Sequence, residues 1–529
     1  MEMATKPEVG AGETAAGERR SRRGHPGLTL LSLALGIIMV GLDGSVVAIA
    51  NPKIAADLGA SLSELQWITN AYLLTLGILL IPAGKLGDRF GRRKMFLVGV
   101  VGFGVASVGI GLIGSTAGVI GLRIVQGAFG ALLMPNSLAI IRATFPPEKL
   151  NAAIGIWSGA SGVSIAAGPI VGGLLVEHVS WESVFFINLP IALAALAVGS
   201  RVLLESRSDA ESSTDIPGLA TLAGGLFAIV FGLIKAQEWG WGSGKTIGFL
   251  VAGAALLVAF GLIESRTRLP LLPMRLFRNR SLTIGTVTVL VGFLAMFGVL
   301  FFLTLYLQSV HGYSPVAAGV RTLPLSLTMM VMAPVAGILL DRIGPRPILT
   351  GGLAAIGVGL LLMTGIEPDS SFTGLIAPLV LLGAGLGSVI TAASEVIVGN
   401  APVEDAGVAG GLQSTAVQVG GVMGTAILGS VLSSRVGSVL VEKLTGAGVP
   451  ESVADTLTGA KETVAQGVAP VVEGVSPQVQ AAIVTGSHEA FMAGFQTSMV
   501  IGAILAFAAA IGALFIQRGE KREGVVAVH

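Results

Sequence analysis

Apolar segments of about 20 residues recur along nearly the whole chain and constrain the fold more than any other feature. Segments of that length and composition are typical of helices that span a lipid bilayer. Only 12% of the 529 residues are charged, about half the fraction found in a soluble domain. The pattern predicts fourteen spans, and therefore an all-α polytopic membrane protein.

Basic residues are concentrated in the connections on one side of the predicted spans. With the amino terminus in the cytoplasm, 24 of the 32 lysines and arginines fall on the cytoplasmic side. This excess predicts orientation, and an even number of spans places both termini on one side. We therefore expect a multi-pass protein of the plasma or inner membrane, with cytoplasmic tails at 1–26 (basic) and 517–529.

A charged stretch between two apolar segments has a weaker second copy. Gly84 to Lys94 reads GKLGDRFGRRK, and Gly337 to Arg346 (GILLDRIGPR) repeats six of its residues at an offset of 253. The same offset places the first span on the ninth. The chain thus divides into a six-helix half (27–204), a linker with two inserted transmembrane helices (205–281), and a six-helix half with a long outer loop at 433–488 (282–516).

This division has a functional meaning. Two parallel halves are a transporter plan, with the substrate bound between them near the midplane. Loop 433–488 is expected to cover the outer face or to be a variable insertion, and a functional lid is the alternative.

Two ionisable residues lie inside apolar segments, Asp43 in the first and Arg123 in the fourth. Charge in lipid is costly, so such residues mark functional sites by default. With a helical rise of 1.5 Å per residue, both lie roughly 8–10 Å below the outer boundary, so we expect them to meet. An aspartate beside an arginine stays charged and takes a proton when the arginine moves away. A permanent structural ion pair is the alternative.

These stretches resemble the motifs of the major facilitator superfamily, in particular its drug/proton antiporter family with fourteen spans. Gly84 to Lys94 is similar to the family's signature loop between helices 2 and 3. The segments 42–52 (LDGSVVAIANP) and 122–131 (LRIVQGAFGA) resemble its first-helix and fourth-helix motifs, with Ser45 where Thr is usual. The resemblance implies the major facilitator fold and links Asp43 and Arg123 to proton coupling.

The resemblance also implies a conformational switch at the signature loop. Asp88 is expected to pair with a nearby arginine and with the amino end of a helix in the other half, which locks the outward-open state. The residues assigned to this switch are Gly84, Asp88, Arg89, Gly91, Arg92, Asp341 and Arg342. The alternative is that the basic residues, Arg93 and Lys94 above all, only set the topology.

Glycines at three- and four-residue spacing form a flat packing face in the fifth span, and a proline kinks that helix. The stretch resembles the antiporter motif of exporters, which indicates export; its residues are Gly159, Gly162, Gly168, Pro169, Gly172 and Gly173. The connection after this span departs from the family, because Glu182 follows Trp181 where exporters usually carry Arg.

Polar and aromatic residues inside the spans are candidates for the substrate pathway: Trp67, Asn70, Tyr72, Gln126, Asn136 and Gln308. Hydrogen bonding between helices is the alternative role, and for Trp67 an interfacial anchor. Glu395, near the end of a span, is either a second protonation site or a boundary charge.

The sequence favours a secondary exporter over an enzyme. It has no phosphate-binding loop, no visible nucleophile and base, and no cysteine, so we predict no catalytic residue, cofactor or metal. Small-molecule substrates (hydrophobic or cationic drugs or antibiotics), protons and lipid are the expected partners of a monomer that binds no nucleic acid. The alternatives are an exporter of one endogenous metabolite or self-made antibiotic, and a non-transporting membrane sensor.

Overall fold

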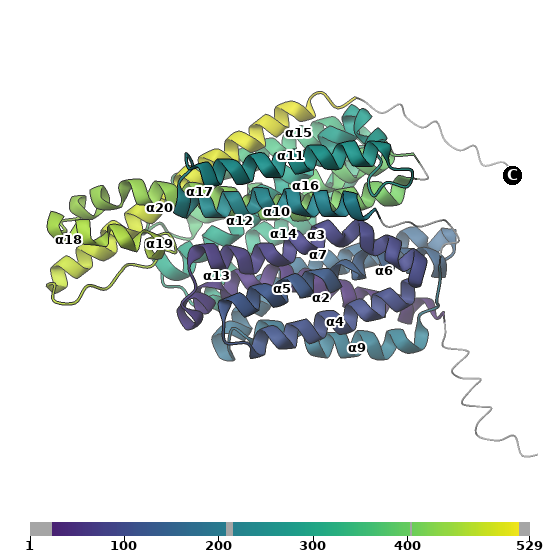
Figure 1. Ribbon diagram of the computed structural model, residues 1–529, viewed down its shortest axis with the longest axis horizontal. Helices are drawn as coiled ribbons and strands as arrows, with labels where there is room; N and C mark the ends of the chain where they lie inside the picture. The colour runs from purple at the N-terminus through teal and green to yellow at the C-terminus, as the bar shows by residue number, and fades with distance from the viewer. Residues whose placement is uncertain (1–23, 208–214, 403–404, 518–529) are drawn as a thin grey trace, which may run out of the picture.

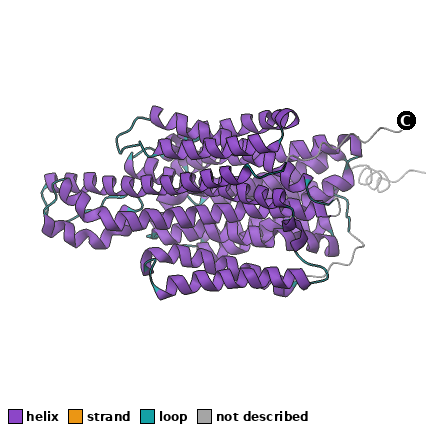
Figure 2. Ribbon diagram, turned by 90° about the horizontal axis from the view of Figure 1, so that it is seen from above, coloured by secondary structure: helices purple, strands orange, loops and turns teal. Residues whose placement is uncertain are grey.

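The computed structural model describes residues 24–207, 215–402 and 405–517 (Figure 1). These residues form helices and connections without a strand (Figure 2). Within them, fourteen helical segments are long and apolar enough to cross a membrane. The predicted all-α class and number of spans are therefore confirmed.

Six spans make up the first half of the molecule. Its helices are α2 (Pro26–Leu58), α3 (Leu62–Phe90), α4 (Arg92–Leu112), α5 (Thr116–Ala131) with α6 (Leu133–Thr144), α7 (Pro147–His178), and α8 (Ser183–Phe186) with α9 (Asn188–Val202). The helix α2 packs on α7 and α9, while α5 packs on α3 and α4. These contacts bring α2, α4, α5 and α9 around one interior.

Two inserted spans connect the halves. The helices α10 (Ile216–Trp239) and α11 (Gly244–Arg266) pack on each other, and α10 also contacts α3 of the first half and α17 of the second. A short helix, η1 (Met274–Arg278), then leads into the second half. The inserted pair is therefore a neighbour of both halves.

The second half again has six spans. They are α12 (Arg280–Leu305) with the π-helix η2 (Tyr306–Val310), α13 (Pro315–Arg321) with α14 (Leu323–Ile343), α15 (Pro345–Met363), α16 (Thr373–Gly399), α17 (Ala406–Gly446) and α20 (Pro477–Ala513). The two halves meet where α7 packs on α13 and where α3 packs on α17.

Short polar signals decide where the helices begin and end. The helix α2 ends at Gly59, whose φ of 63° is left-handed, and α3 begins after Ser61. Ser61 accepts a hydrogen bond from the Glu64 N–H, and the Glu64 carboxylate accepts one from the Ser61 N–H, which is a capping box. The chain thus reverses direction between two spans within a few residues.

The charged stretch from Gly84 to Lys94 is a helix junction rather than an extended loop. The helix α3 continues to Phe90 and α4 begins at Arg92, so only Gly91 separates them. Gly91 has a φ of 108°, which residues with a side chain rarely adopt. The Glu205 carboxylate accepts hydrogen bonds from the N–H groups of Arg93 (3.1 Å) and Lys94 (3.3 Å) and so caps α4.

Residues 433–488, which the hydropathy pattern assigns to a long outer loop, are largely helical. The helices α17 and α20 have 41 and 37 residues, well beyond the ~20 that cross a bilayer. They project from the bundle as a hairpin that carries α18 (Glu451–Thr456) at its far end (Figure 1). The segments η4 (Leu457–Ala460) and α19 (Lys461–Val464) then lead back toward the bundle, where Gln466 donates a hydrogen bond to the Ala60 carbonyl at 3.4 Å. Gly486 lies against the Leu444 backbone, so the two helices approach closely and bury each other's apolar residues.

Candidate functional site

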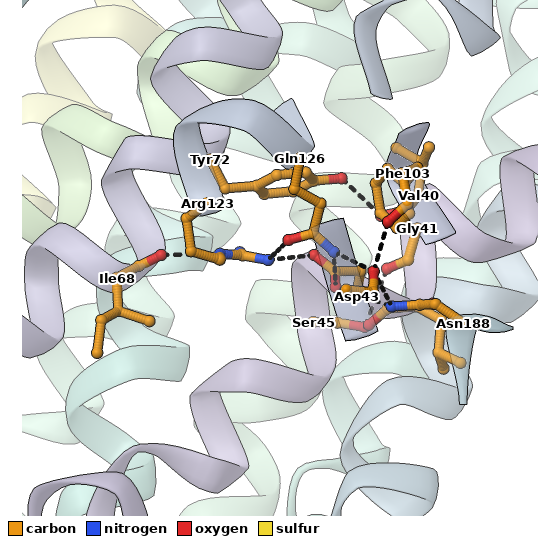
Figure 3. A network of polar contacts seen from close by, with 12 residues as sticks. Val40, Gly41, Asp43, Ser45, Ile68, Tyr72, Phe103, Arg123, Gln126 and Asn188 are labelled. Carbon is orange, nitrogen blue, oxygen red and sulfur yellow. Dashed lines mark hydrogen bonds and ion pairs between the residues drawn. The ribbon is translucent and has the colours of Figure 1, made fainter. Parts of the chain in front are cut away.

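A buried ion pair joins two helices of the first half. An Arg123 Nη1–H of α5 donates to Asp43 Oδ2 of α2, and the two residues are 1% and 0% exposed (Figure 3). Arg123 Nε also donates to the Ile68 carbonyl at 2.9 Å, and the guanidinium lies 4.1 Å from the centre of the Tyr72 ring. The structure therefore brings together the two charges that the depth argument places at one level.

Neutral amides complete the surroundings of the carboxylate. Asp43 Oδ1 accepts hydrogen bonds from Gln126 Nε2 at 2.8 Å and from Asn188 Nδ2 at 3.1 Å. Gln126 lies one turn after Arg123 on α5, and its Oε1 accepts from Arg123 Nη1 at 2.7 Å. Gln126 and Asn188 also donate to the Ser107 hydroxyl, at 2.8 and 3.3 Å. We call these five residues the Asp43 network.

The network is complementary to a charged carboxylate. Asp43 receives hydrogen bonds from a guanidinium and two amides, so both of its oxygens have donors. A buried ion pair is tolerable only when such additional bonds satisfy it, and removal of one partner leaves an uncompensated charge.

Ser107 and Asn188 are absent from the residues predicted as site members. Ser107 is a single hydroxyl inside an apolar helix, and such residues commonly bond their own helix, as Ser107 does to the Phe103 carbonyl. Asn188 carried a usable signal, because an amide at the start of an apolar span, two residues before Pro190, is costly unless it has a partner. The site thus draws on α4 and α9 as well as α2 and α5.

The glycine-rich segment of α7 packs on the helix that carries Asp43. A Cβ at Gly168 would meet the Ser45 side chain, and one at Gly172 would meet Val46. Next to them, Gly173 lies against the backbone of Pro315 in α13. Residues 168–173 are therefore packed between α2 and the other half.

The three other residues predicted in this segment, Pro169, Gly159 and Gly162, differ in whether they contact the second half. Gly319 of α13 approaches the Pro169 carbonyl, so that a Cβ at Gly319 would lie 2.2 Å from the oxygen. A Cβ at Gly159 or Gly162 would meet no atom within 4 Å. Pro169 and Gly173 therefore approach α13 closely, whereas Gly159 and Gly162 have open space where a Cβ would be.

The two signature stretches differ in their surroundings. Asp88 forms an ion pair with Arg92 at 2.8 Å, and Arg89 lies over the exposed Phe90 ring. A Cβ at Gly84 would contact Pro135 at 3.5 Å. In the second copy, Asp341 and Arg342 are both exposed.

The candidate pathway residues do not form one group. Tyr72 and Gln126 lie at the Asp43 network, where the Tyr72 hydroxyl donates to the Val40 carbonyl at 3.2 Å. Asn136 donates to the Leu132 carbonyl at 2.7 Å, close to Gly87. Trp67 instead packs against the aromatic rings of α10.

Two further candidates bridge the halves. Asn70 accepts a hydrogen bond from Thr425 of α17 at 2.6 Å, and Gln308 donates to the Ile49 carbonyl of α2 at 3.0 Å. Glu395 is exposed near the end of α16. Within the described ranges, the acidic residues and histidines form no group of three or more suited to a metal.

A helical bundle of fourteen membrane spans with a buried ion pair defines a polytopic membrane protein of the transporter type. The model of the Major Facilitator Superfamily matches residues 33–425, so the chain belongs to this superfamily. It is therefore a transporter by family and not an enzyme.

Relatives of this chain are resistance and export proteins. The tetracenomycin C resistance and export protein of Streptomyces glaucescens is 47% identical over 502 residues, which cover 95% of this chain and 93% of that protein. The puromycin resistance protein of Streptomyces alboniger is 37% identical over 448 residues, which cover 83% of this chain and 88% of that protein. The multidrug efflux pump LfrA of Mycolicibacterium smegmatis is 31% identical and covers 91% and 94%.

Solved structures share the fold at low sequence identity. A bacterial homologue of the human lysosomal transporter Spinster, in an inward-facing and unoccupied conformation, is 18% identical with a TM-score of 0.61. The match covers 92% of this chain and 98% of that one. This likeness in fold agrees with the match to the superfamily.

Proposed function

We propose that this protein is a proton-driven antiporter that exports hydrophobic or cationic drugs or antibiotics across the cell membrane by alternating access. The observation that carries the proposal is the Asp43–Arg123 pair, a titratable charge enclosed in a membrane span. Relatives that are named as antibiotic-resistance and efflux proteins support the export of such compounds.

Proton binding at Asp43 would weaken the contact between α2 and α5 in the first half. A neutral Asp43 carboxyl no longer attracts Arg123, while the guanidinium keeps its bonds to the Ile68 carbonyl and to Gln126. The packing of α7 on α2 links that change to α13 across the interface. Protonation of Asp43 then favours one of two arrangements of the protein, because the proton binds to these two arrangements with different affinity.

The signature junction is proposed as the second part of the switch. In the present arrangement Asp88 pairs with Arg92 on its own side. In the opposite arrangement Asp88 would turn to the amino end of a helix in the other half, where the helix dipole favours a carboxylate. The excess of basic residues on the side of the termini supports cytoplasmic tails.

The relatives also favour a narrower substrate range as a second candidate. Proteins named for tetracenomycin C, puromycin and actinorhodin are among them, which supports export of one antibiotic made by the producing cell. The two candidates share the coupling mechanism and differ only in the binding surface between the halves.

Efflux from cells that express the wild type or Asp43→Asn, with and without an uncoupler, tests the proposal. Ethidium and puromycin serve as probes, and Glu451→Gln, which removes an exposed carboxylate in α18, is the matched control. We expect efflux that an uncoupler abolishes, that Asp43→Asn lacks and that the control retains. Efflux that survives both the uncoupler and Asp43→Asn would remove the coupling mechanism. Wild-type cells that expel neither probe would contradict broad export.

A further inference from the structure

The inserted helices carry a second group of buried charges, far along the chain from Asp43. Asp215 is the N-cap of α10 and Glu264 lies near the end of α11; they are 8% and 2% exposed. Asp215 Oδ1 accepts a hydrogen bond from the Gly218 N–H at 2.8 Å. Glu264 faces the backbone amides of Leu271 and Leu272, and its Oε2 accepts from the latter at 3.1 Å. One oxygen of each carboxylate is therefore satisfied by the backbone.

The other oxygen of each carboxylate points to a common position. Asp215 Oδ2 and Glu264 Oε1 are buried and have no hydrogen-bond partner in the part of the chain that the structure describes. Both lie beside Gly218, at 2.8 and 2.5 Å from the position that a Cβ would take there. The absence of a side chain at Gly218 leaves room for the two oxygens to approach each other.

One basic residue faces this pair. Lys85, at the start of the signature junction, donates its ammonium hydrogens to the carbonyls of Pro270 at 2.9 Å and Leu269 at 3.4 Å. The charged groups that act on Glu264 are Asp215 and Lys85. Neither carboxylate is in direct contact with a basic group among the described residues, so two negative charges would face a single ammonium.

Two buried carboxylates at one place cannot both be ionised without a further positive charge, because their repulsion is strong where water is excluded. We propose that Asp215 and Glu264 form a carboxyl–carboxylate pair that binds one proton between Oδ2 and Oε1. With the proton in place the pair carries a single negative charge, which the Lys85 ammonium balances. Each unpartnered oxygen then has a partner, since one donates the shared hydrogen and the other accepts it.

A proton fits this position better than a metal ion. The pair offers only two carboxylates, and the described residues contain no group of three acidic or histidine ligands. The carbonyls of Leu269 and Pro270, which a cation would need as further ligands, already accept from Lys85.

The site gives the inserted helices a role beyond spacing the two halves. Lys85 lies on α3, three residues before Asp88, so the position of the signature junction sets the counter-charge of the pair. When the junction moves Lys85 away, the pair holds its proton more firmly; when Lys85 returns, the proton is released more readily. The inference stands apart from proton coupling at Asp43 and does not depend on it.

Infrared spectroscopy of the purified protein in lipid vesicles tests the shared proton directly. At pH 7.5 exposed carboxylates are ionised, so a band of neutral carboxyl groups reports buried protonated ones. We expect such a band in the wild type and its loss in both Asp215→Asn and Glu264→Gln, because the remaining carboxylate then pairs with Lys85 alone. Asn at 215 remains a good N-cap, so this variant is expected to fold even if Glu264→Gln does not.

The controls separate this site from the other carboxylates. Asp43→Asn and Glu395→Gln, which removes an exposed carboxylate, are expected to keep the band. In Lys85→Gln the pair holds its proton more firmly, so the band should disappear at a higher pH than in the wild type. A wild type without the band, or a band that persists in both Asp215→Asn and Glu264→Gln, would overturn the proposal. Loss of the band in Asp43→Asn would assign the proton to Asp43 and would equally overturn it.

Discussion

The two halves repeat one architecture but differ in what they bury. The offset of 253 residues that superposes the signature stretches places Met296 where the first half has Asp43. Applied to Arg123, the same offset gives Ile376, in the first turn of α16. Met296 is 1% exposed inside the second half, whereas Ile376 is 39% exposed on its surface. Among the described residues, only the first half encloses an ion pair at these positions.

The same contrast holds at the helix junctions. Gly91 and Gly344 occupy equivalent positions and both have positive φ, 108° and 77°. A Cβ at Gly91 would lie 2.6 Å from the Glu205 carboxylate, whereas a Cβ at Gly344 would meet nothing within 4 Å. At Gly91 both the backbone conformation and the neighbouring Glu205 exclude a side chain, whereas at Gly344 only the backbone conformation does.

Removal of Arg123 is expected to have the largest effect. Arg123→Met leaves the Asp43 carboxylate buried without its counter-charge, which costs about 3–5 kcal/mol. Thermal unfolding in detergent measures the loss. The matched change in the second half, Ile376→Met, alters an exposed apolar residue and should stay within about 0.5 kcal/mol of the wild type.

A double variant sharpens this test. Asp43→Asn combined with Arg123→Met removes both charges and should be more stable than Arg123→Met alone. Equal stability of the single and double variants would show that packing around Arg123, rather than its pairing with Asp43, sets the cost.

Alanine at the two junction glycines compares their surroundings. Gly344→Ala should lose about 1–3 kcal/mol of stability because of its positive φ alone. Gly91→Ala should lose more, since its Cβ also displaces Glu205 from the amino end of α4. Chemical unfolding in mixed micelles gives both values; a larger loss for Gly344→Ala would contradict the assigned difference.

Substitution of the junction aspartates, Asp88 and Asp341, should change stability by smaller and unequal amounts. Asp88 and Arg92 have side chains that are 36% and 23% exposed, so Asp88→Asn should cost about 0.2–1 kcal/mol. Asp341→Asn should cost nothing measurable, because Asp341 is exposed and forms no ion pair within the described residues. Thermal shifts of the two variants, measured side by side at low salt, test the difference, and equal shifts would refute it.

The second half has its own titratable cluster, which lies at the far end of α12. His311 Nε2 is 2.8 Å from the Tyr306 hydroxyl, and its ring stacks on Tyr313. Burial lowers the pKa of His311 and the Arg321 guanidinium lowers it further, while Asp369 opposes them. The neutral imidazole is therefore the form that the folded state accommodates.

A small pH effect follows with a defined sign. Because the folded state disfavours protonated His311, its contribution is complete above the ordinary histidine pKa of about 6.5 and declines as pH falls below it. The melting temperature of His311→Asn should therefore fall less than that of the wild type between pH 7.5 and pH 5.5. An identical fall of the melting temperature in both proteins would show that protonation of His311 does not affect stability between pH 7.5 and pH 5.5.

The sequence predicts the scaffold and the central pair because both depend on strong, regular signals. Apolar segments of one length identify the spans, and helical rise places Asp43 and Arg123 at one depth. Ser107 gives no signal because a single hydroxyl in a span commonly bonds its own helix, whereas the amide of Asn188 indicates that a partner is needed but not which residue it is. Their role depends on which faces of α4 and α9 meet α2, and that is a tertiary fact.

Other differences have local physical causes. The hairpin of α17 and α20 is missed because its hydropathy falls while the helices continue, held by their mutual packing around Gly486. The pair of Asp215 and Glu264 looks like two boundary charges in the sequence. Only the fold of α10 on α11 directs both carboxylates to Gly218.

Transport in vesicles that contain purified protein tests the central claim most directly. Labelled puromycin can be followed in two modes, exchange without a gradient and accumulation driven by an imposed pH gradient. The account predicts that the wild type performs both, and that Asp43→Asn keeps exchange but loses gradient-driven accumulation. Accumulation by Asp43→Asn at the wild-type level would contradict the assignment of Asp43 as the proton carrier.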